Sequence, residues 1–150
     1  MKNKHKIAYM ETAFVWSKCS IANKLKVGCV LVKNNRVISN GYNGMPSNIN
    51  DDCELPDGST DPRVRHAEKN CLNAMMKFNE SSVGSLMFCT HSCCEPCAID
   101  IVEAGVKEFY YKETYRCSSG IKYLLKNKVN VFKYLEEESR FKCIYFEEDA

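Results

Sequence analysis

The second half of the chain alternates short apolar runs with helical patterns, and this alternation constrains the fold more than any other feature. The strand-like and helical runs follow one another in the order 86–91, 95–104, 106–111, 119–126 and 129–132. Gly105 comes directly after the first helical run, a position where glycine commonly ends a helix. Because strands that alternate with helices build β-α-β units, we expect an α/β fold here.

An antiparallel hairpin is expected before this alternating region. Residues 27–32 (Val-Gly-Cys-Val-Leu-Val) form a short apolar run, Asn34-Asn35 is a turn signal, and residues 36–39 are the expected return strand. Helical patterns lie on either side of the hairpin, at about 4–18 and from His66 to about Phe78. The patterns together predict one domain over residues 1–150, an α/β sandwich around a mixed five-stranded sheet.

Two segments lack a regular pattern. Residues 41–65 begin with Gly-Tyr-Asn-Gly-Met-Pro and continue with several Asp, Pro and Gly residues, which predicts a long loop of the kind that often carries function. The tail from Leu135 is first charged and then apolar, with Phe141, Ile144, Tyr145 and Phe146. We assign no element to this tail.

Composition narrows the classes of protein. Lys and Arg total 21 against 19 Asp and Glu, a net charge of +2, whereas nucleic-acid binders usually carry a basic excess. No apolar run approaches the ~18 residues of a membrane span, and the lysine-rich start is too short for a signal peptide. The ten cysteines include several inside apparently regular elements, which favours buried free thiols over a disulfide framework. We expect an intracellular, cytoplasmic protein.

Two short motifs stand where predicted helices begin. His66-Ala67-Glu68 opens one helix, and Cys94-Glu95-Pro96-Cys97 opens the next. Two cysteines three positions apart can direct both sulfurs at one point, and the positive helix start favours their thiolates. Both helix starts should lie at the same end of the sheet. His66, Cys94 and Cys97 are therefore predicted to hold one zinc ion with one coordination position left open.

Glu68 lies two residues beyond the predicted histidine ligand. A catalytic zinc lowers the pKa of its water to about 7, and a carboxylate beside it can move the protons. Each piece alone has a simpler explanation: a redox pair or structural half-site for the cysteines, a solvated or capped position for His66, and a helix-dipole residue for Glu68. In combination they follow the order of zinc base deaminases.

On these residues the chain resembles the cytidine deaminase superfamily and, within it, the deoxycytidylate (dCMP) deaminases, including phage-type members. The resemblance runs from about Lys18 to Phe132. Its motifs are 27–32, Gly-Tyr-Asn-Gly-Met-Pro at 41–46, His-Ala-Glu with Asn70, Cys-Glu-Pro-Cys-Ala at 94–98, and Ala-Gly-Val-Lys at 104–107. One departure is Cys93, which stands where the family usually has proline. The competing register, Cys93 with Cys97, fits the motif less well, and Cys93 would be a spare thiol near the metal.

The resemblance implies a three-layer α-β-α cytidine deaminase-like fold and the zinc-dependent reaction of dCMP with water to give dUMP and ammonia, supplying thymidylate synthesis. It implies substrate contacts by Asn43, Ala67, Tyr115 and Arg116, with Lys112 as another candidate for the phosphate. It also implies a homo-oligomer, often a hexamer, activated by dCTP and inhibited by dTTP. A triphosphate effector, with Mg²⁺ where it is needed, would bind near Lys24, Lys26 and Gly28. Asn43 could equally be a turn residue, and the cations could be ordinary surface charge.

Other interpretations stay open at this point. The same metal site could act on bases within nucleic acid, on another free cytosine nucleoside or nucleotide, or belong to a zinc-stabilised module without catalysis. Cys19 and Cys53 could bind a second metal, but no spare histidine stands near Cys53 in the sequence, so free thiols are favoured.

Overall fold

The computed structural model describes residues 1–145, and Phe146 therefore lies outside the described residues. The helices are α1 (Asn3–Ser17), α2 (Ala67–Ala74), α3 (Glu95–Glu103) and α4 (Ser119–Lys126). The strands are β1 (Gly28–Lys33), β2 (Arg36–Tyr42), β3 (Leu86–His91), β4 (Glu108–Glu113), β5 (Asn130–Leu135) and β6 (Arg140–Ile144). Short 3₁₀ turns follow α2 and β5, at Met75–Lys77 and Glu136–Glu138.

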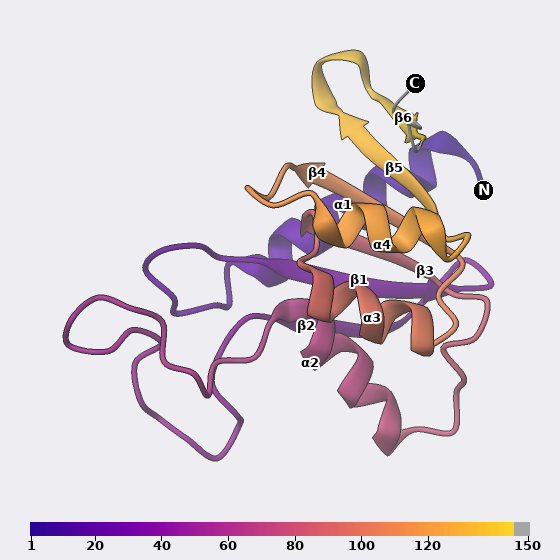
Figure 1. The fold of residues 1–150 in the computed structure, drawn as a ribbon. Helices are drawn as coiled ribbons and strands as arrows, with labels where there is room; N and C mark the ends of the chain where they lie inside the picture. Colours follow the sequence, from indigo (N-terminus) through magenta and orange to yellow (C-terminus); the bar gives the residue numbers. More distant parts are fainter. Residues whose placement is uncertain (146–150) are drawn as a thin grey trace.

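The strands form one mixed sheet in the order β2-β1-β3-β4-β5-β6. β1 runs antiparallel to both β2 and β3, β3 to β5 are parallel, and β6 returns antiparallel to β5. Helix α1 covers one face, and α2, α3 and α4 cover the other (Figure 1). The predicted three-layer α-β-α architecture, with a hairpin followed by β-α units, is confirmed.

Alternation along the central strands explains the two helical layers. In β3, Met87 and Cys89 belong to the core beneath α2 to α4, whereas Phe88 belongs to the core beneath α1. In β1, Leu31 belongs to the core beneath α2 to α4, and Val30 belongs to the core beneath α1. Because both faces of these strands are buried, they appear in the sequence as continuous apolar runs.

The prediction of five strands is wrong by one, because the tail contributes β6. A charged 3₁₀ turn and Ser139, whose φ of 49° is left-handed, reverse the chain after β5. Phe141 on β6 packs its ring against Tyr110 and Tyr134, and this packing stabilises the pairing of β6 with β5. The strand was missed because two of its residues are exposed and its apolar pattern is weak.

The extent of one helix also differs from expectation. The predicted helix from His66 to Phe78 ends as an α-helix at Ala74, and Met76 beyond it is 83% exposed. In α1, Val15 is 60% exposed, while Met10 and Ala13 make the buried contacts. Within residues 1–145, no helix has the length and apolar character needed to cross a membrane.

Candidate active site and metal centre

The candidate site lies where β3 and β4 end. These parallel strands finish at the same edge of the sheet, and the loops after them lead into α3 and α4. The two loops are joined directly: the Ser92 amide donates to the Glu113 carbonyl at 2.9 Å, and the Tyr115 amide donates to the Ser92 hydroxyl at 2.6 Å. Such an edge is where open α/β sheets usually place a ligand.

Three predicted side chains from two helix starts meet at this edge. The ligand atoms of His66, Cys94 and Cys97 all lie within 4.8 Å of one another, and within residues 1–145 no other group of three or more potential metal ligands does so. The sulfurs of Cys94 and Cys97 lie 3.4 and 3.3 Å from His66 Nδ1. In tetrahedral zinc sites, nitrogen and sulfur ligands lie about 3.5 Å apart. The donor set and its spacing therefore fit a zinc ion.

Two glycines allow the helix starts to come close enough. A Cβ atom at Gly41 would lie 2.5 Å from the Ala67 carbonyl oxygen, so β2 can support the first turn of α2 only without a side chain there. A Cβ atom at Gly120 would lie 2.1 Å from the Cys93 carbonyl oxygen. Close backbone approach of this kind is a use that only glycine permits. The two contacts hold the histidine and cysteine segments in place.

The three ligand side chains affect one another's protonation, and the thiolate of Cys94 is favoured. Hydrogen bonding with Cys97 lowers the pKa of Cys94 to about 4. Burial opposes this shift, and the hydrogen bond and charge of His66 add to it. The hydrogen bond with Cys94 raises the pKa of His66. The Cys94 thiol therefore ionises readily, and the thiolate is the form that coordinates a soft cation.

Glu68 lies beside this group and is not part of it. Its side chain is buried, with 4% relative exposure, and desolvation by burial raises the pKa of its carboxyl group. The thiol of Cys89 donates to Glu68 Oε1 at 3.3 Å. A carboxyl group with a raised pKa can both accept and deliver a proton near neutral pH.

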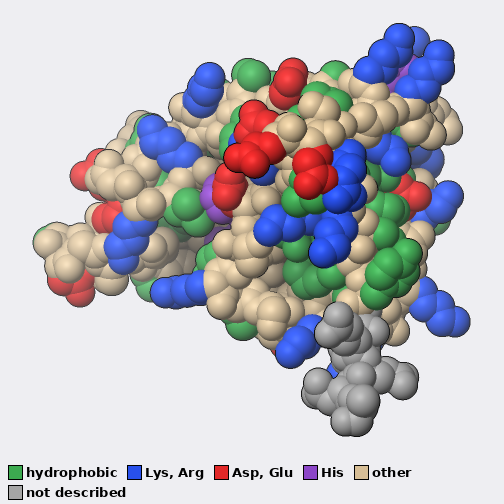
Figure 2. All heavy atoms as spheres, turned by 90° about the horizontal axis from the view of Figure 1, so that it is seen from above, with side chains coloured by type: hydrophobic (Ala, Val, Ile, Leu, Met, Phe, Trp, Pro, Cys, Tyr) green, Lys and Arg blue, Asp and Glu red, His purple; other side chains and the backbone are tan. Residues whose placement is uncertain are grey.

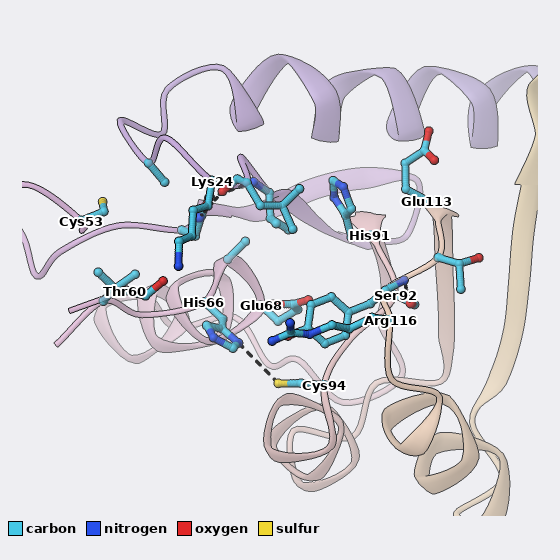
Figure 3. Close-up of a pocket in the computed structure, with 18 of the residues that line it drawn as sticks. Lys24, Cys53, Thr60, His66, Glu68, His91, Ser92, Cys94, Glu113 and Arg116 are labelled. Carbon is cyan, nitrogen blue, oxygen red and sulfur yellow. Dashed lines mark hydrogen bonds between the residues drawn. The ribbon is translucent and has the colours of Figure 1, made fainter. Parts of the chain in front are cut away.

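A cavity of about 720 Å³ opens over these groups. Its lining comes from the two motifs, from the segment 22–27 before β1, from the loops after β3 and β4, and from the loop that precedes α2. Figure 3 shows Lys24 and Arg116 at the same hollow as His66, Glu68 and Cys94. The cavity is large enough for a nucleotide and places cationic side chains around the candidate metal site.

His91, at the end of β3, also lines the cavity. The sequence motifs gave it no role. The Gly28 amide donates to Thr90 Oγ1 at 3.1 Å, and Thr90 Oγ1 lies 2.7 Å from His91 Nδ1. Because the hydroxyl already accepts from Gly28, it can donate to His91 Nδ1, which leaves the proton on Nε2. Burial lowers the pKa of His91, which favours this neutral form.

Comparison with known proteins agrees with this geometry. Residues 3–113 match the family described as the cytidine and deoxycytidylate deaminase zinc-binding region. The chain belongs to the cytidine and deoxycytidylate deaminase family. The predicted resemblance is thus confirmed, and the three-layer architecture is the cytidine deaminase-like fold.

Individual members of the deaminase family show how close the likeness is. The crystal structure of a dCMP deaminase from cyanophage S-TIM5, in complex with dCMP and dUMP, has 47% identity and a TM-score of 0.87, covering 89% of this chain and 98% of that one. The deoxycytidylate deaminase of Schizosaccharomyces pombe is 32% identical over 142 residues. That of phage T4 is 29% identical over 147 residues, covering 71% of this chain and 76% of its own.

The lengths of these relatives differ. The matched region covers 87% of this chain and 44% of the S. pombe deaminase. The corresponding values for the Saccharomyces cerevisiae deoxycytidylate deaminase are 86% and 45%. The chain thus spans less than half of these two yeast relatives, whereas it spans nearly all of the cyanophage structure.

Asn43, predicted to contact substrate or to serve as a turn residue, lines the cavity and also ties two loops together. Its Oδ1 accepts from the Val27 amide at 2.8 Å, and its Nδ2 donates to the Leu25 carbonyl at 2.7 Å. A primary amide has a second proton and a second lone pair. The structure therefore gives Asn43 the turn role and leaves it capacity for a ligand.

The other predicted substrate residues divide into two groups. Ala67, Tyr115 and Arg116 all line the cavity. The guanidinium carbon of Arg116 lies 5.8 Å from the centre of the Tyr115 ring. Lys112 is not among the lining residues: it is ion-paired with Glu136 and lies over the Phe14 ring. Of the two phosphate candidates, only Arg116 reaches the cavity.

The predicted effector residues are separated by the structure. Lys24 lines the main cavity and a second hollow of about 600 Å³. Lys26 is exposed and lines neither hollow, and Gly28 is buried against the Ala13 carbonyl of α1. A side chain at position 28 would clash with α1, which explains why this residue is glycine.

The remaining cysteines behave as free thiols. All ten cysteines are free of disulfide bonds, and six of them are buried. Cys93 is buried and packs into the core, so the three-ligand group uses Cys94 and Cys97 in the predicted register. Cys19 is exposed and Cys53 is buried, and neither joins a group of three potential ligands among the described residues.

Proposed function

We propose that this chain is a zinc-dependent deaminase that converts dCMP and water to dUMP and ammonia. The observation that carries the proposal is a set of three ligand atoms with a buried carboxylate beside it, at the floor of a nucleotide-sized cavity. A catalytic zinc site has three protein ligands and one open corner, whereas a structural site has four. The match to the zinc-binding deaminase family supports the same assignment.

His66, Cys94 and Cys97 are the proposed zinc ligands. When bound, zinc supplies a polarised water whose pKa is near neutral. Cys94 and Cys97 lie at the start of α3, where free amide groups favour negative charge. The helix start thereby stabilises the two proposed thiolates.

Glu68 is the proposed carrier of protons. It takes a proton from the attacking water and delivers it to the ring nitrogen next to the reacting carbon. The remaining proton of that water then passes through Glu68 to the amino group, which leaves as ammonia while the ring keeps the oxygen. Burial raises the pKa of the Glu68 carboxyl group and so suits it to both steps. Because Glu68 is not a ligand, its loss should leave the metal in place.

The substrate contacts are proposed from the lining of the cavity. Arg116 and Lys24 are the cations available to a 5′-phosphate, and a planar guanidinium can bind two phosphate oxygens at once. Tyr115 offers a ring to the sugar and base, and the second amide proton of Asn43 can be donated to the nucleotide. The backbone of Ala67 lines the cavity between the histidine and the glutamate. The dCMP and dUMP held by the cyanophage relative support this substrate class.

A substrate panel tests the proposal. Ammonia and product are measured for dCMP, CMP, deoxycytidine and a cytosine-containing oligonucleotide with the zinc-loaded protein. We expect dCMP to be preferred over deoxycytidine by more than about tenfold in kcat/KM, because a charge-assisted phosphate contact contributes at least about 1.4 kcal/mol. Equal turnover of deoxycytidine would favour a nucleoside deaminase, and equal turnover of the oligonucleotide would favour an enzyme of nucleic acid. Either result would contradict the proposal.

The surface charge also favours a free nucleotide. Lys and Arg side chains lie among Asp and Glu on the face drawn in Figure 2, and the net charge of the whole chain is +2. A strand of nucleic acid requires a continuous basic path. This mixed distribution supports a small-molecule substrate.

We extend the proposal to regulation and assembly on the strength of the family resemblance. The protein is proposed to act in the cytoplasm as a homo-oligomer, a hexamer, and to supply dUMP for thymidylate synthesis. It is proposed to be activated by dCTP and inhibited by dTTP, with Mg²⁺ accompanying the triphosphate. Lys24, which lines both hollows, is the cation proposed for an effector, because Arg63 in the second hollow is already paired with Asp51 and Asp61. Adding dCTP or dTTP to the dCMP assay, with sedimentation in parallel, tests these points.

A further inference from the structure

A row of buried thiols leads from the core to the proposed proton carrier. Cys29 and Cys89 lie opposite each other on the antiparallel pair of β1 and β3, and both are completely buried. Cys71 on α2 is buried next to Cys29, with which it shares a hydrogen bond. At the other end of the row, the thiol of Cys89 reaches Glu68 Oε1. Only this last thiol contacts the glutamate by a hydrogen bond.

The thiol of Cys89 is a donor in this contact. Burial raises the pKa of Cys89 to about 11, so the group keeps its proton at neutral pH. Its sulfur lies 3.3 Å from Glu68 Oε1, inside an apolar region where water does not compete. A hydrogen bond is electrostatically stronger in such surroundings than in water.

The contact engages one of the two carboxylate oxygens. With Oε1 held against β3 by the thiol, Oε2 can exchange protons with water and substrate. A carboxylate without this contact could turn about its last side-chain bond, because such terminal torsions have broad minima. Proton transfer requires the acid or base within hydrogen-bonding reach of its target, so a fixed orientation increases the rate of the chemical step.

We propose that Cys89 is a positioning residue whose thiol hydrogen bond fixes the carboxylate of Glu68 for proton transfer. The kinetic consequence of this inference rests on the proposed function. The hydrogen bond between Cys89 and Glu68 does not depend on that function. Cys89 touches neither the substrate nor the three metal-binding side chains in this account. It acts only through Glu68.

Infrared spectroscopy of the zinc-loaded protein tests the contact without using activity. The S–H stretching band of a thiol falls in frequency when the thiol donates a hydrogen bond. We expect Cys89→Ala to remove one low-frequency S–H band. Glu68→Gln should move that band to higher frequency, because an amide oxygen is a weaker acceptor than a carboxylate. Cys71→Ala should leave the band in place. A band that does not move in Glu68→Gln overturns the proposal.

Kinetics with dCMP test the consequence. We expect Cys89→Ala to lower kcat about tenfold with KM within about twofold, because the lost bond matters in the chemical step and not in binding. Cys89→Val, which removes the donor without leaving a cavity, should show the same loss. Cys89→Ser, which keeps a donor, should stay within about threefold of the unmodified protein.

Cys71→Ala is the matched control, since it removes a buried thiol that does not contact Glu68, and its kcat per zinc ion should be unchanged. Equal kcat values for Cys89→Ala and Cys71→Ala would overturn the proposal, as would a Cys89→Ser variant as slow as Cys89→Ala. Failure of the proposed function would be seen differently: the unmodified protein would not turn over dCMP, while the infrared shift would persist.

Discussion

Two walls of the cavity differ in construction. The metal wall, residues 66–68 and 91–97, comes from the starts of α2 and α3 and the end of β3, and it carries the three ligand atoms with Glu68. The loop wall, residues 43–65, contains no helix or strand and lies between β2 and α2. The groups proposed to perform the chemistry therefore lie on helices and a strand, whereas much of the surface that would face the substrate is formed by a loop.

The loop wall is nevertheless tied in place by specific polar contacts. Asn43 fixes its start to the loop before β1, and Gly44 forms an isolated bridge with Arg65 that joins its two ends. In its middle, Arg63 makes ion pairs with Asp51 and Asp61 at 2.8 and 2.9 Å. These contacts are few and partly exposed, so each can be removed without dismantling the sheet. The two walls should therefore respond differently to substitution.

The largest effect is expected in the metal wall. His66→Ala removes one of three proposed ligands, so the variant should lose its zinc and fall to background dCMP turnover. Structural and catalytic zinc ions also contribute to folding free energy, so the midpoint of thermal unfolding should fall. Zinc content by plasma mass spectrometry and calorimetry measure both changes. A full zinc content in this variant would show that His66 is not a metal ligand.

Arg116→Ala tests a cation of the cavity that belongs to neither wall. The variant should raise KM for dCMP about tenfold or more, because a charge-assisted hydrogen bond to phosphate is lost. The kcat/KM for deoxycytidine, which has no phosphate, should change by less than about twofold if only phosphate binding is removed. Parallel assays of the two substrates provide the internal control. An equal loss for both substrates would assign Arg116 a structural role.

Asn43→Ala tests the junction of the loop wall with β1. The variant loses two hydrogen bonds to backbone groups, and leaving such groups unpaired costs about 1–3 kcal/mol. We expect kcat/KM for dCMP to fall about tenfold, mainly through KM, with zinc content unchanged. Asn70→Ala is a matched control, because its Nδ2 donates to the Tyr42 carbonyl and it does not line the cavity. If the control loses as much activity, the effect belongs to general stability.

The smallest effect is expected for Arg63→Ala in the middle of the loop wall. Hydrogen bonding with Arg63 lowers the pKa of Asp61, so the ion pair is formed at neutral pH, but half of the arginine side chain is exposed. Exposed pairs contribute little. We expect activity within about threefold of the unmodified protein and faster proteolysis within residues 51–63. Limited proteolysis followed by mass spectrometry checks this outcome. Unchanged cleavage would mean that the ion pairs do not order the loop.

The sequence predicted the metal wall because its information is local. The His-Ala-Glu and Cys-x-x-Cys motifs each open a helix, and the strand-helix alternation places both helix starts at one edge of the sheet. The same alternation predicted the layers and β3 to β5. These features depend on periodicity and on short spacings, which one sequence displays directly.

Other features depend on contacts between distant segments and left no comparable signal. β6 is held by aromatic packing of Phe141 against β4 and β5, while its own pattern is weak. The Thr90 hydroxyl that contacts His91 also accepts from the Gly28 amide, 62 positions away, and the contact of Cys89 with Glu68 joins residues 21 positions apart. Lys112 could not be separated from Arg116 until its ion pair with Glu136 was seen.

The most direct test of the central claim is the zinc content and dCMP turnover of Glu68→Gln, measured on one preparation. The claim is that three side chains hold the metal while a fourth moves protons. It predicts a full equivalent of zinc, as in the unmodified protein, with dUMP formation at least about a hundredfold slower, because general acid–base catalysis contributes about 10²–10⁴ in rate. Loss of zinc would show that Glu68 holds the metal, and unimpaired dUMP formation would show that it does not carry the protons.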